Sequence, residues 1–244
     1  MSTKCQCFSP AFVYLGISDT MDIQKYILPR IGTGKTPIKI AILISGSGSG
    51  MKALIEHQFK KENCVHSTEL VISNNLKSQG LKYSKSKGVS TIVVELPTQG
   101  NSEEKRRLHE QLIESELERH EIEVVILSGY MRILSPYFVE KWIGRLLNIH
   151  PSLLPDFPGA HAHQEALDAG VKESGCTVHF VDMGVDTGPI LAQQKVLIFP
   201  NDNLKELQNR IKTYEHKIYP MVIDALSEGR VEIISSTEVI IHNP

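Results

Sequence analysis

Residues 38–61, IKIAILISGSGSGMKALIEHQFKK, decide the fold of this chain. The first eight residues form a continuous apolar run rich in isoleucine, which is typical of a strand covered on both faces. A glycine-serine turn follows at 45–50, and residues 51–61 have the apolar spacing of a helix. This order of buried strand, tight turn and helix predicts the first unit of a parallel α/β sheet.

The same alternation continues along the first half of the chain. Strands are predicted at 67–75, 89–96 and 122–130, with helices at 76–88 and from 101 or 102 to about residue 120. Alternation of this kind predicts right-handed crossovers and a doubly wound, mainly parallel sheet of the α/β class. Ligands of such sheets bind beyond the carboxyl ends of the strands, so each polar turn after a strand is a candidate site.

The second half of the chain has a different pattern. Residues 145–150 are predicted as a fifth strand, and the next two apolar runs are typical of an antiparallel pair. A long amphipathic helix with a kink near Pro220 then precedes two short terminal strands. The predicted ranges are 177–183 and 190–198 for the pair, 201–229 for the helix, and 231–235 and 237–242 for the terminal strands. We therefore expect one domain over residues 37–244, with an antiparallel C-terminal part, after an N-terminal extension of unknown role at 1–36.

Composition excludes several classes of protein. The chain has 244 residues, of which 41% are hydrophobic and 22% charged, as in an ordinary globular domain. A net charge of −2 provides no basic field for nucleic acid, and no apolar run reaches the length of a membrane span. The four cysteines form no Cys-x-x-Cys pair, and residues 1–36 are neither rich in arginine nor free of acids. We expect a cytoplasmic protein with no nucleic-acid or membrane partner.

The turn SGSGSG at Ser45–Gly50 joins the first strand to the first helix. Free backbone N–H groups and the helix dipole favour an anion at such a turn, although a merely tight connection would use the same residues. The placement favours anion binding. The turn lacks the Gly-x-Gly-x-x-Gly and Gly-Lys-Ser/Thr patterns, and Ser73-Asn74 after the second strand offers no acid for a ribose. A small phosphorylated metabolite therefore fits better than NAD or ATP.

Asn148 and His150 alternate by two at the end of the fifth strand, so their side chains point to the same side. An amide and an imidazole that converge on one carbonyl oxygen can stabilise an oxyanion. A carboxylate such as Asp186 could keep the imidazole protonated or accept its proton. A polar strand end that caps the following proline-rich loop is an equally good interpretation of these two residues.

Histidines gather near this loop without the pattern of a metal site. His150, His161, His163 and His179 could supply imidazoles, but no His-Glu-x-x-His arrangement or clear further ligand accompanies them. His179, between apolar residues, is expected to be a hydrogen-bonded structural histidine, and Cys176 a small buried hydrophobic residue. We expect no metal.

Five segments combine into a more specific pattern: LISGSGSGMKALI, LSGYMRILSPYFV, GRLLNIHPSLLPDFPGAHAHQEALDAG, GCTVHFVDMGVDTGPILAQQKV and YEHKIYPMVIDALSEGR. In order and spacing, these segments resemble the phosphoribosylglycinamide formyltransferases, folate-dependent enzymes of purine biosynthesis. The resemblance covers about residues 38 to 233. HPSLLP is shared with other enzymes of 10-formyltetrahydrofolate, whereas the glycine-serine turn and PGAHAH select the purine enzyme. A Rossmann-like formyltransferase fold is implied, with ribonucleotide binding in its N-terminal half and folate binding and catalysis in its C-terminal half.

The resemblance also implies a reaction and a role for each matching residue. The formyl group of 10-formyltetrahydrofolate, the co-substrate, would pass to the amine of N1-(5-phospho-D-ribosyl)glycinamide. Asn148 and His150 would polarise the formyl oxygen, with His150 as general acid and Asp186 as its carboxylate. The implied ribonucleotide-binding residues are Gly48, Ser49, Gly50 and Glu215, and the implied folate-binding residues are Arg106, Met131, Arg132, Ile133, Leu134, Asn148, Asp182 and Asp186. The implied partners are these small molecules, and the implied state is a monomer or homodimer.

The chain departs from the family pattern at one turn. The family usually has Gly-Asn-Gly-Ser-Asn, whereas this chain has Ser47 and Gly50 at the two asparagine positions. This change keeps the backbone N–H donors of the turn and removes two side-chain amides, so a lower phosphate affinity or a more mobile helix start is expected.

Two other functions are alternatives for this chain: a 10-formyltetrahydrofolate hydrolase, in which water replaces the amine, and a non-catalytic ligand sensor.

Overall fold

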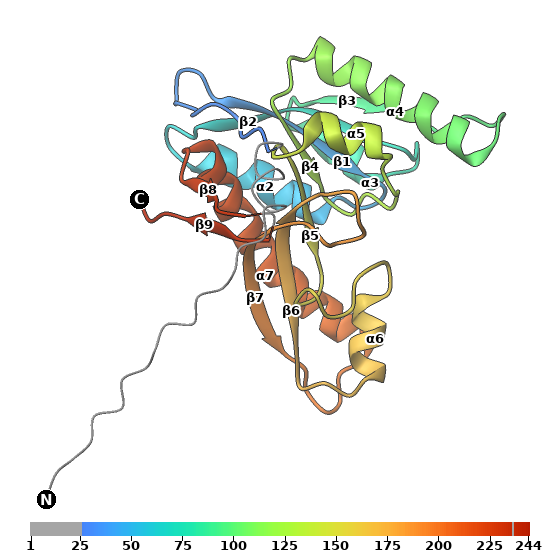
Figure 1. Cartoon of the computed structure of the whole chain (residues 1–244), viewed down its shortest axis with the longest axis vertical. Coiled ribbons are helices and arrows are strands. Elements are labelled where there is room, and N and C mark those ends of the chain that lie inside the picture. The colour runs from blue at the N-terminus through green and yellow to red at the C-terminus, as the bar shows by residue number, and fades with distance from the viewer. Residues whose placement is uncertain (1–25, 236) are drawn as a thin grey trace, which may run out of the picture.

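The computed structural model describes residues 26–235 and 237–244 as a seven-stranded sheet flanked by helices (Figure 1). The strand order is β3-β2-β1-β4-β5-β6-β7. The strands are β1 (Ile38–Ile44), β2 (His66–Ser73), β3 (Ser90–Val93), β4 (Val124–Leu127), β5 (Leu146–His150), β6 (Glu173–Phe180) and β7 (Ile190–Leu197). β1 to β5 are parallel, and β6 and β7 run antiparallel to their neighbours. The predicted fold class is confirmed.

Helices cover the sheet on both faces. They are α2 (Ser49–Lys60), α3 (Gln79–Ser86), α4 (Ser102–Arg119), α5 (Pro136–Trp142), α6 (Ala162–Asp168) and α7 (Leu204–Ser227). Ile40 and Ile42 of β1 belong to a core cluster with α2 and α7, whereas Ala41 and Leu43 belong to a second cluster with α4 and α5. Side chains alternate across a strand, so one continuous apolar run supplies both cores. Such burial on both faces explains why this run predicts the fold.

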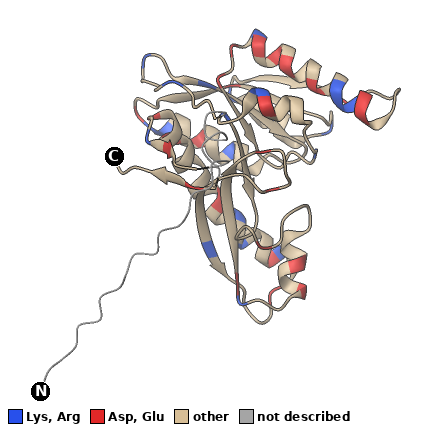
Figure 2. Ribbon diagram, viewed as in Figure 1, with Lys and Arg blue, Asp and Glu red and all other residues tan. Residues whose placement is uncertain are grey.

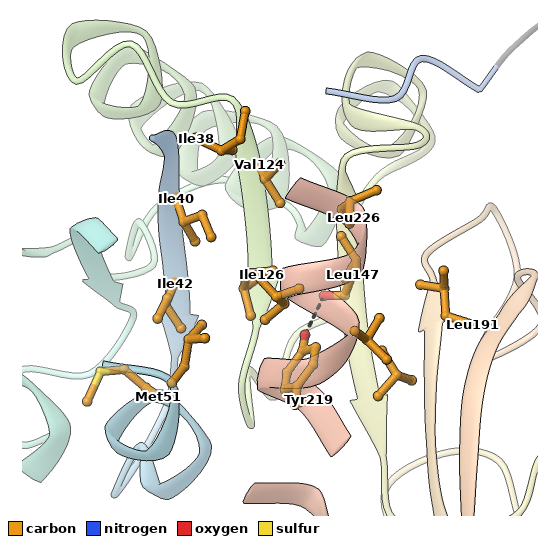
Figure 3. Close-up of a cluster of buried hydrophobic side chains, with 14 of the residues drawn as sticks. Ile38, Ile40, Ile42, Met51, Val124, Ile126, Leu147, Leu191, Tyr219 and Leu226 are labelled. Carbon is orange, nitrogen blue, oxygen red and sulfur yellow. Dashed lines mark hydrogen bonds between the residues drawn. The ribbon is translucent and has the colours of Figure 1, made fainter. Parts of the chain in front are cut away.

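Helix α7 is fixed to the middle of the sheet by one tyrosine. The Tyr219 hydroxyl is directed at two strand-end carbonyls, 3.0 Å from Leu127 O and 3.1 Å from Leu147 O. Figure 3 shows this side chain among the isoleucines of β1 and β4, with its bond to Leu147. Complete burial places the pKa of the Tyr219 hydroxyl well above its ordinary value, so it remains a neutral donor. The ends of β4 and β5 are therefore held against α7.

Several predicted boundaries were too long, and two helices were not predicted. The fourth strand stops at Leu127 because Gly129 adopts a left-handed backbone, with φ of 68°, that turns the chain out of the sheet. The strand predicted at 177–183 lies at 173–180. Helix α5 begins after the N-cap Ser135, with Pro136 at its first position. This pair of residues is a known signal for the start of a helix. Helix α6 follows the proline-rich loop.

Residues 26–36, part of the predicted extension, pack against the domain. Tyr26 makes an edge contact with Phe180 at a centroid distance of 5.9 Å, and the backbone N–H of Gly32 donates to Ser227 O. The remainder of the extension, with Cys5 and Cys7, lies outside the described residues. Two further strands, β8 (Val231–Ile233) and β9 (Val239–Ile241), form a small antiparallel sheet near the C-terminus.

Surface charges of both signs are interspersed along α4 (Figure 2).

No helix within the described part of the chain combines the length and apolar character that a membrane crossing requires.

Candidate active site

Asp186 is the centre of a polar cluster beyond the carboxyl end of β5. Its Oδ2 lies 3.2 Å from His150 Nδ1 and accepts a 2.9 Å bond from the Gly159 N–H, and its Oδ1 lies 3.3 Å from the Asn148 amide nitrogen. Burial would raise the pKa of this carboxyl, but hydrogen bonds from His179 and Gly159 and the charge of His150 lower it to about 2. Asp186 is therefore a fixed negative charge at neutral pH.

His150 is buried with both ring nitrogens engaged. Its Nδ1 faces Asp186, and its Nε2 lies 2.8 Å from the carbonyl oxygen of Phe157. Both partners can only accept, so the doubly protonated imidazolium satisfies both contacts at once. Phe157 holds its carbonyl in place with a left-handed backbone, at φ of 53°.

In the structure, His179 joins Asn148 and His150, the two residues that strand periodicity aligns. Asn148 on β5 pairs with His179 on β6 in the antiparallel register. His179 Nδ1 donates to Phe180 O at 2.8 Å, and its Nε2 lies 3.3 Å from the Asn148 amide nitrogen and 3.5 Å from Asp186 Oδ1. The prediction of a hydrogen-bonded histidine is confirmed, but His179 also lies within the charged cluster. Sequence reasoning missed this because the contact depends on the β5–β6 register.

A pocket opens beside this cluster. It is lined by Leu127, Tyr130, Arg132, Ile133, Leu134, Val139, Asn148, His179, Val181 and residues 182–186. Arg132, Ile133, Leu134, Asn148, Asp182 and Asp186 are thus six of the eight predicted folate-binding residues. Asp182 shapes the wall through bonds to the Gly184 N–H and the Thr187 hydroxyl. Apolar walls with a polar floor are typical of a site for a flat, partly polar ligand.

Two predicted residues lie outside the lining. Met131 is 65% exposed, and its backbone N–H donates to the Ser45 hydroxyl. Arg106 lies on α4, where its buried Nε has no hydrogen-bond partner among the described residues. An unpaired buried guanidinium N–H is costly, so an acceptor from a bound ligand would satisfy it.

Helix α4 holds the loop that forms one wall of the pocket. His109 Nε2 lies 2.7 Å from the Tyr130 hydroxyl at one end of the loop, and Glu110 accepts bonds from the backbone N–H and the hydroxyl of Ser135 at the other. Both α4 side chains are almost fully buried. Neighbouring residues of one helix therefore fix both ends of residues 130–135, a role that local sequence patterns do not indicate.

The glycine-serine turn has the geometry expected at a helix start. Gly48 is the N-cap of α2 with a left-handed backbone at φ of 63°, and no side chain caps the helix. A side chain added at Gly50 would place its Cβ 2.7 Å from the Ser128 hydroxyl. This hydroxyl therefore occupies space that the family's asparagine needs, which gives a structural reason for the departure at position 50.

Glu215 lies on α7 and is not among the residues that line the pocket. Burial raises the pKa of its carboxyl to about 7, although Lys212 opposes the shift. Burial is the main cause that lowers the pKa of His163 to about 4, and the positive charges of Lys212 and His150 contribute to this shift. His163 Nε2 is buried without a hydrogen-bond partner among the described residues. Lys212 therefore acts electrostatically on both Glu215 and His163, and His150 acts on His163.

The fold and the site together define an α/β protein of the formyl transferase class. Residues 38–223 match the formyl transferase family. The chain is 38% identical to phosphoribosylglycinamide formyltransferase of Escherichia coli over 196 residues, which are 80% of this chain and 90% of that protein. A glycinamide ribonucleotide transformylase of Symbiobacterium toebii superimposes with a TM-score of 0.78 at 36% identity, covering 85% of this chain and 95% of that one. The chain belongs to the phosphoribosylglycinamide formyltransferase family.

Some relatives are much longer than this chain. The human trifunctional purine biosynthetic protein adenosine-3 is 41% identical over 199 residues, which are 82% of this chain and 19% of that protein. The chain spans between 14% and 21% of the length of the trifunctional relatives that it matches.

Proposed function

We propose that this protein transfers the formyl group of 10-formyltetrahydrofolate to the amine of N1-(5-phospho-D-ribosyl)glycinamide in purine biosynthesis. The observation that carries the proposal is the Asp186 cluster: Asp186 contacts Asn148, His150 and His179, and Asn148, His179 and Asp186 line the pocket. The family to which the chain belongs supports both substrates.

The ligands divide between two parts of the site. The folate lies in the pocket against residues 132–134 and 182–186, and the Arg106 guanidinium pairs with one of its acceptors. The ribonucleotide phosphate binds the backbone N–H groups of Gly48, Ser49 and Gly50 at the start of α2. Glu215 accepts hydrogen bonds from the ribonucleotide. The two substrates then meet at Asn148 and His150.

The chemistry follows from this arrangement. The substrate amine attacks the formyl carbon, and the formyl oxygen becomes an oxyanion that receives hydrogen bonds from the Asn148 amide and the His150 imidazolium. His150 exchanges its contact with Phe157 O for the substrate, and Asp186 stabilises the positive charge. When the tetrahedral intermediate collapses, the folate N10 leaves with a proton from His150, and the neutral imidazole then takes the extra proton of the attacking nitrogen, which restores the imidazolium. No residue changes its covalent state.

The test is formyl-folate consumption with and without the ribonucleotide. Consumption that requires the ribonucleotide and yields one formylated product per folate supports the transferase. Release of formate without the ribonucleotide would instead identify a hydrolase. Tight binding of both substrates without transfer would identify a ligand sensor.

We further propose that the protein acts in the cytoplasm as a monomer or homodimer, without a metal in this reaction. Cys64 and Cys176 carry free thiols, which agrees with a reducing compartment. Light scattering at several protein concentrations measures the oligomeric state, and activity after dialysis against a chelator tests the independence from metal.

A further inference from the structure

A second cluster of ionisable side chains lies far from the candidate active site, where α2, β2 and α7 meet. His57 Nε2 lies 2.9 Å from Asp224 Oδ2, and His66 Nε2 lies 2.8 Å from Asp224 Oδ1. The imidazole rings are stacked at a centroid distance of 6.2 Å and an interplanar angle of 12°. One ligand atom from each of the three residues lies within 4.8 Å of the other two. His66 begins β2, so the cluster is at the amino edge of the parallel sheet.

The donor set and its surroundings suit a particular class of ion. Two imidazole nitrogens and one carboxylate oxygen are ligands that Zn²⁺ and similar divalent transition metals prefer over Mg²⁺ or Ca²⁺. The side chains of His66 and Asp224 are 0% and 12% exposed, whereas that of His57 is 30% exposed. The exposed side leaves an entry path and room for water as a fourth ligand. We propose that His57, His66 and Asp224 form a binding site for a divalent transition metal.

Lys61 is the cation that a metal would displace. Its Nζ lies 3.0 Å from Asp224 Oδ1 and 2.9 Å from Glu228 Oε1. Lys61 can therefore release Asp224 and keep an ion pair with Glu228. Asp224 then exchanges one positively charged partner for another of higher charge, and no buried charge is left without a partner.

Gln58 determines the proton balance of the site. Its Oε1 accepts bonds from the backbone N–H and the hydroxyl of Thr68, so its NH₂ group must face His66 Nδ1, at 2.8 Å. His66 Nδ1 is therefore an acceptor, and its Nε2 carries the proton that is donated to Asp224. A metal at Nε2 moves this proton to Nδ1, where it faces the NH₂ of Gln58. Metal uptake thus requires Gln58 to turn or shift, and an acceptor in its place favours uptake.

The site has a structural consequence. Helix α2 begins at the glycine-serine turn and reaches His57 near its other end, and α7 carries both Glu215 and Asp224. A metal would tie α2, β2 and α7 together at the edge opposite the proposed reaction. The ion takes no part in formyl transfer, and this inference does not depend on the proposed function.

The experiment titrates the full-length, chelator-treated protein with Zn²⁺ in a calorimeter near neutral pH. We expect one site that His57→Ala and His66→Ala each weaken by more than the roughly 10- to 100-fold typical of outer-shell changes. Gln58→Glu should tighten the site, since glutamate accepts from Nδ1 and still accepts from Thr68. His242→Ala is the matched control, because His242 pairs with Glu232 at 2.7 Å outside the cluster.

A second measurement keeps the test independent of how the variants fold. Co²⁺ added to the unsubstituted protein should give the visible absorption of a four-coordinate site, and one equivalent of Zn²⁺ should remove it. His57 is partly exposed at the end of α2, so His57→Ala should fold, which circular dichroism verifies. The proposal fails if the protein takes up no Zn²⁺, or if uptake persists unchanged in His57→Ala and His66→Ala.

Discussion

The two edges of the sheet carry clusters of the same composition: two histidines that share one aspartate. At the carboxyl edge, Asp186 lies 3.2 Å from His150 and 3.5 Å from His179, and at the amino edge Asp224 lies 2.8 Å from His66 and 2.9 Å from His57. The pKa of each aspartate is lowered to about 2 against the effect of burial. If residue types alone decided the chemistry, the two clusters would have the same function.

The second partner of each imidazole distinguishes the clusters. His150 faces Asp186 with one ring nitrogen and the carbonyl oxygen of Phe157 with the other, so both of its partners are hydrogen-bond acceptors. His66 faces Asp224 with one ring nitrogen and the NH₂ group of Gln58, a hydrogen-bond donor, with the other. The first arrangement suits proton donation to a substrate, and the second suits a fixed tautomer that holds elements together. Environment, rather than composition, therefore assigns the chemistry.

The largest expected effect separates the clusters by activity. Asn148→Ala and His150→Ala should each lower turnover by about 100- to 1000-fold, as expected when one oxyanion donor is lost. Ribonucleotide binding should remain. His57→Ala is the control and should keep nearly full turnover. Steady-state rates and ribonucleotide titration measure these effects, and more than a tenth of normal activity in His150→Ala would refute the role of His150.

The same amide substitution at the two aspartates should affect different properties. Asp186→Asn should lower turnover severely, since an amide cannot support the imidazolium. Asp224→Asn should leave turnover nearly unchanged and lower the free energy of unfolding by about 1.5–3 kcal/mol, the value of a hydrogen bond to a charged group. Chemical denaturation and rate measurements on both variants test this. Equal losses of activity would contradict the division between the clusters.

Two carboxylates of α7 provide a pH test. Asp224 stays ionised above about pH 2, whereas burial raises the pKa of Glu215 to about 7. The ionised fraction of Glu215 therefore grows as pH rises through 7, and the KM for the ribonucleotide should fall over this range. Glu215→Gln should raise that KM about 10-fold, near the lower value of a charged hydrogen bond, and flatten the profile. An unchanged profile would show that Glu215 does not bind the ribonucleotide.

The loop anchored by α4 should respond more weakly. Glu110→Ala removes both bonds to Ser135, whereas Glu110→Gln keeps an acceptor for the backbone N–H. Each bond is worth about 1 kcal/mol, so the alanine variant should raise the folate KM roughly 5- to 30-fold with little change in the ribonucleotide KM. The glutamine variant should recover part of the loss. Parallel changes in both KM values would indicate a general loss of structure instead.

The smallest effect concerns the phosphate turn. Gly50→Asn alone should not improve ribonucleotide binding, because its Cβ meets the Ser128 hydroxyl at 2.7 Å. Combined with Ser128→Ala, the asparagine has space and should lower the ribonucleotide KM by a few-fold, with Ser128→Ala as the control. Equal effects of Gly50→Asn in both backgrounds would show that Ser128 does not determine this position.

Sequence patterns predicted most of the fold and the chemical centre of the site. The apolar run of β1 predicted a doubly covered strand because both of its faces are buried. Strand alternation placed Asn148 and His150 together, Asp186 was a candidate carboxylate for the imidazole, and the resemblance gave Asp186 that role. Helix α5 was not predicted although Ser135 and Pro136 mark its start, because its seven residues are too few to show a clear helical period. The ends of strands were predicted less well, since local turns such as Gly129 terminate them.

By itself, the sequence determined which residues form most of the strands and helices, and which strand end carries Asn148 and His150, because hydrophobic periodicity and turn chemistry are local properties. The tertiary structure alone decided which distant groups meet. His57 and Asp224 are 167 positions apart and touch because α2 packs against α7, and His179 joins Asp186 because β6 pairs antiparallel to β5. Such contacts depend on the packing of apolar faces that fit many partners, so no local pattern specifies them.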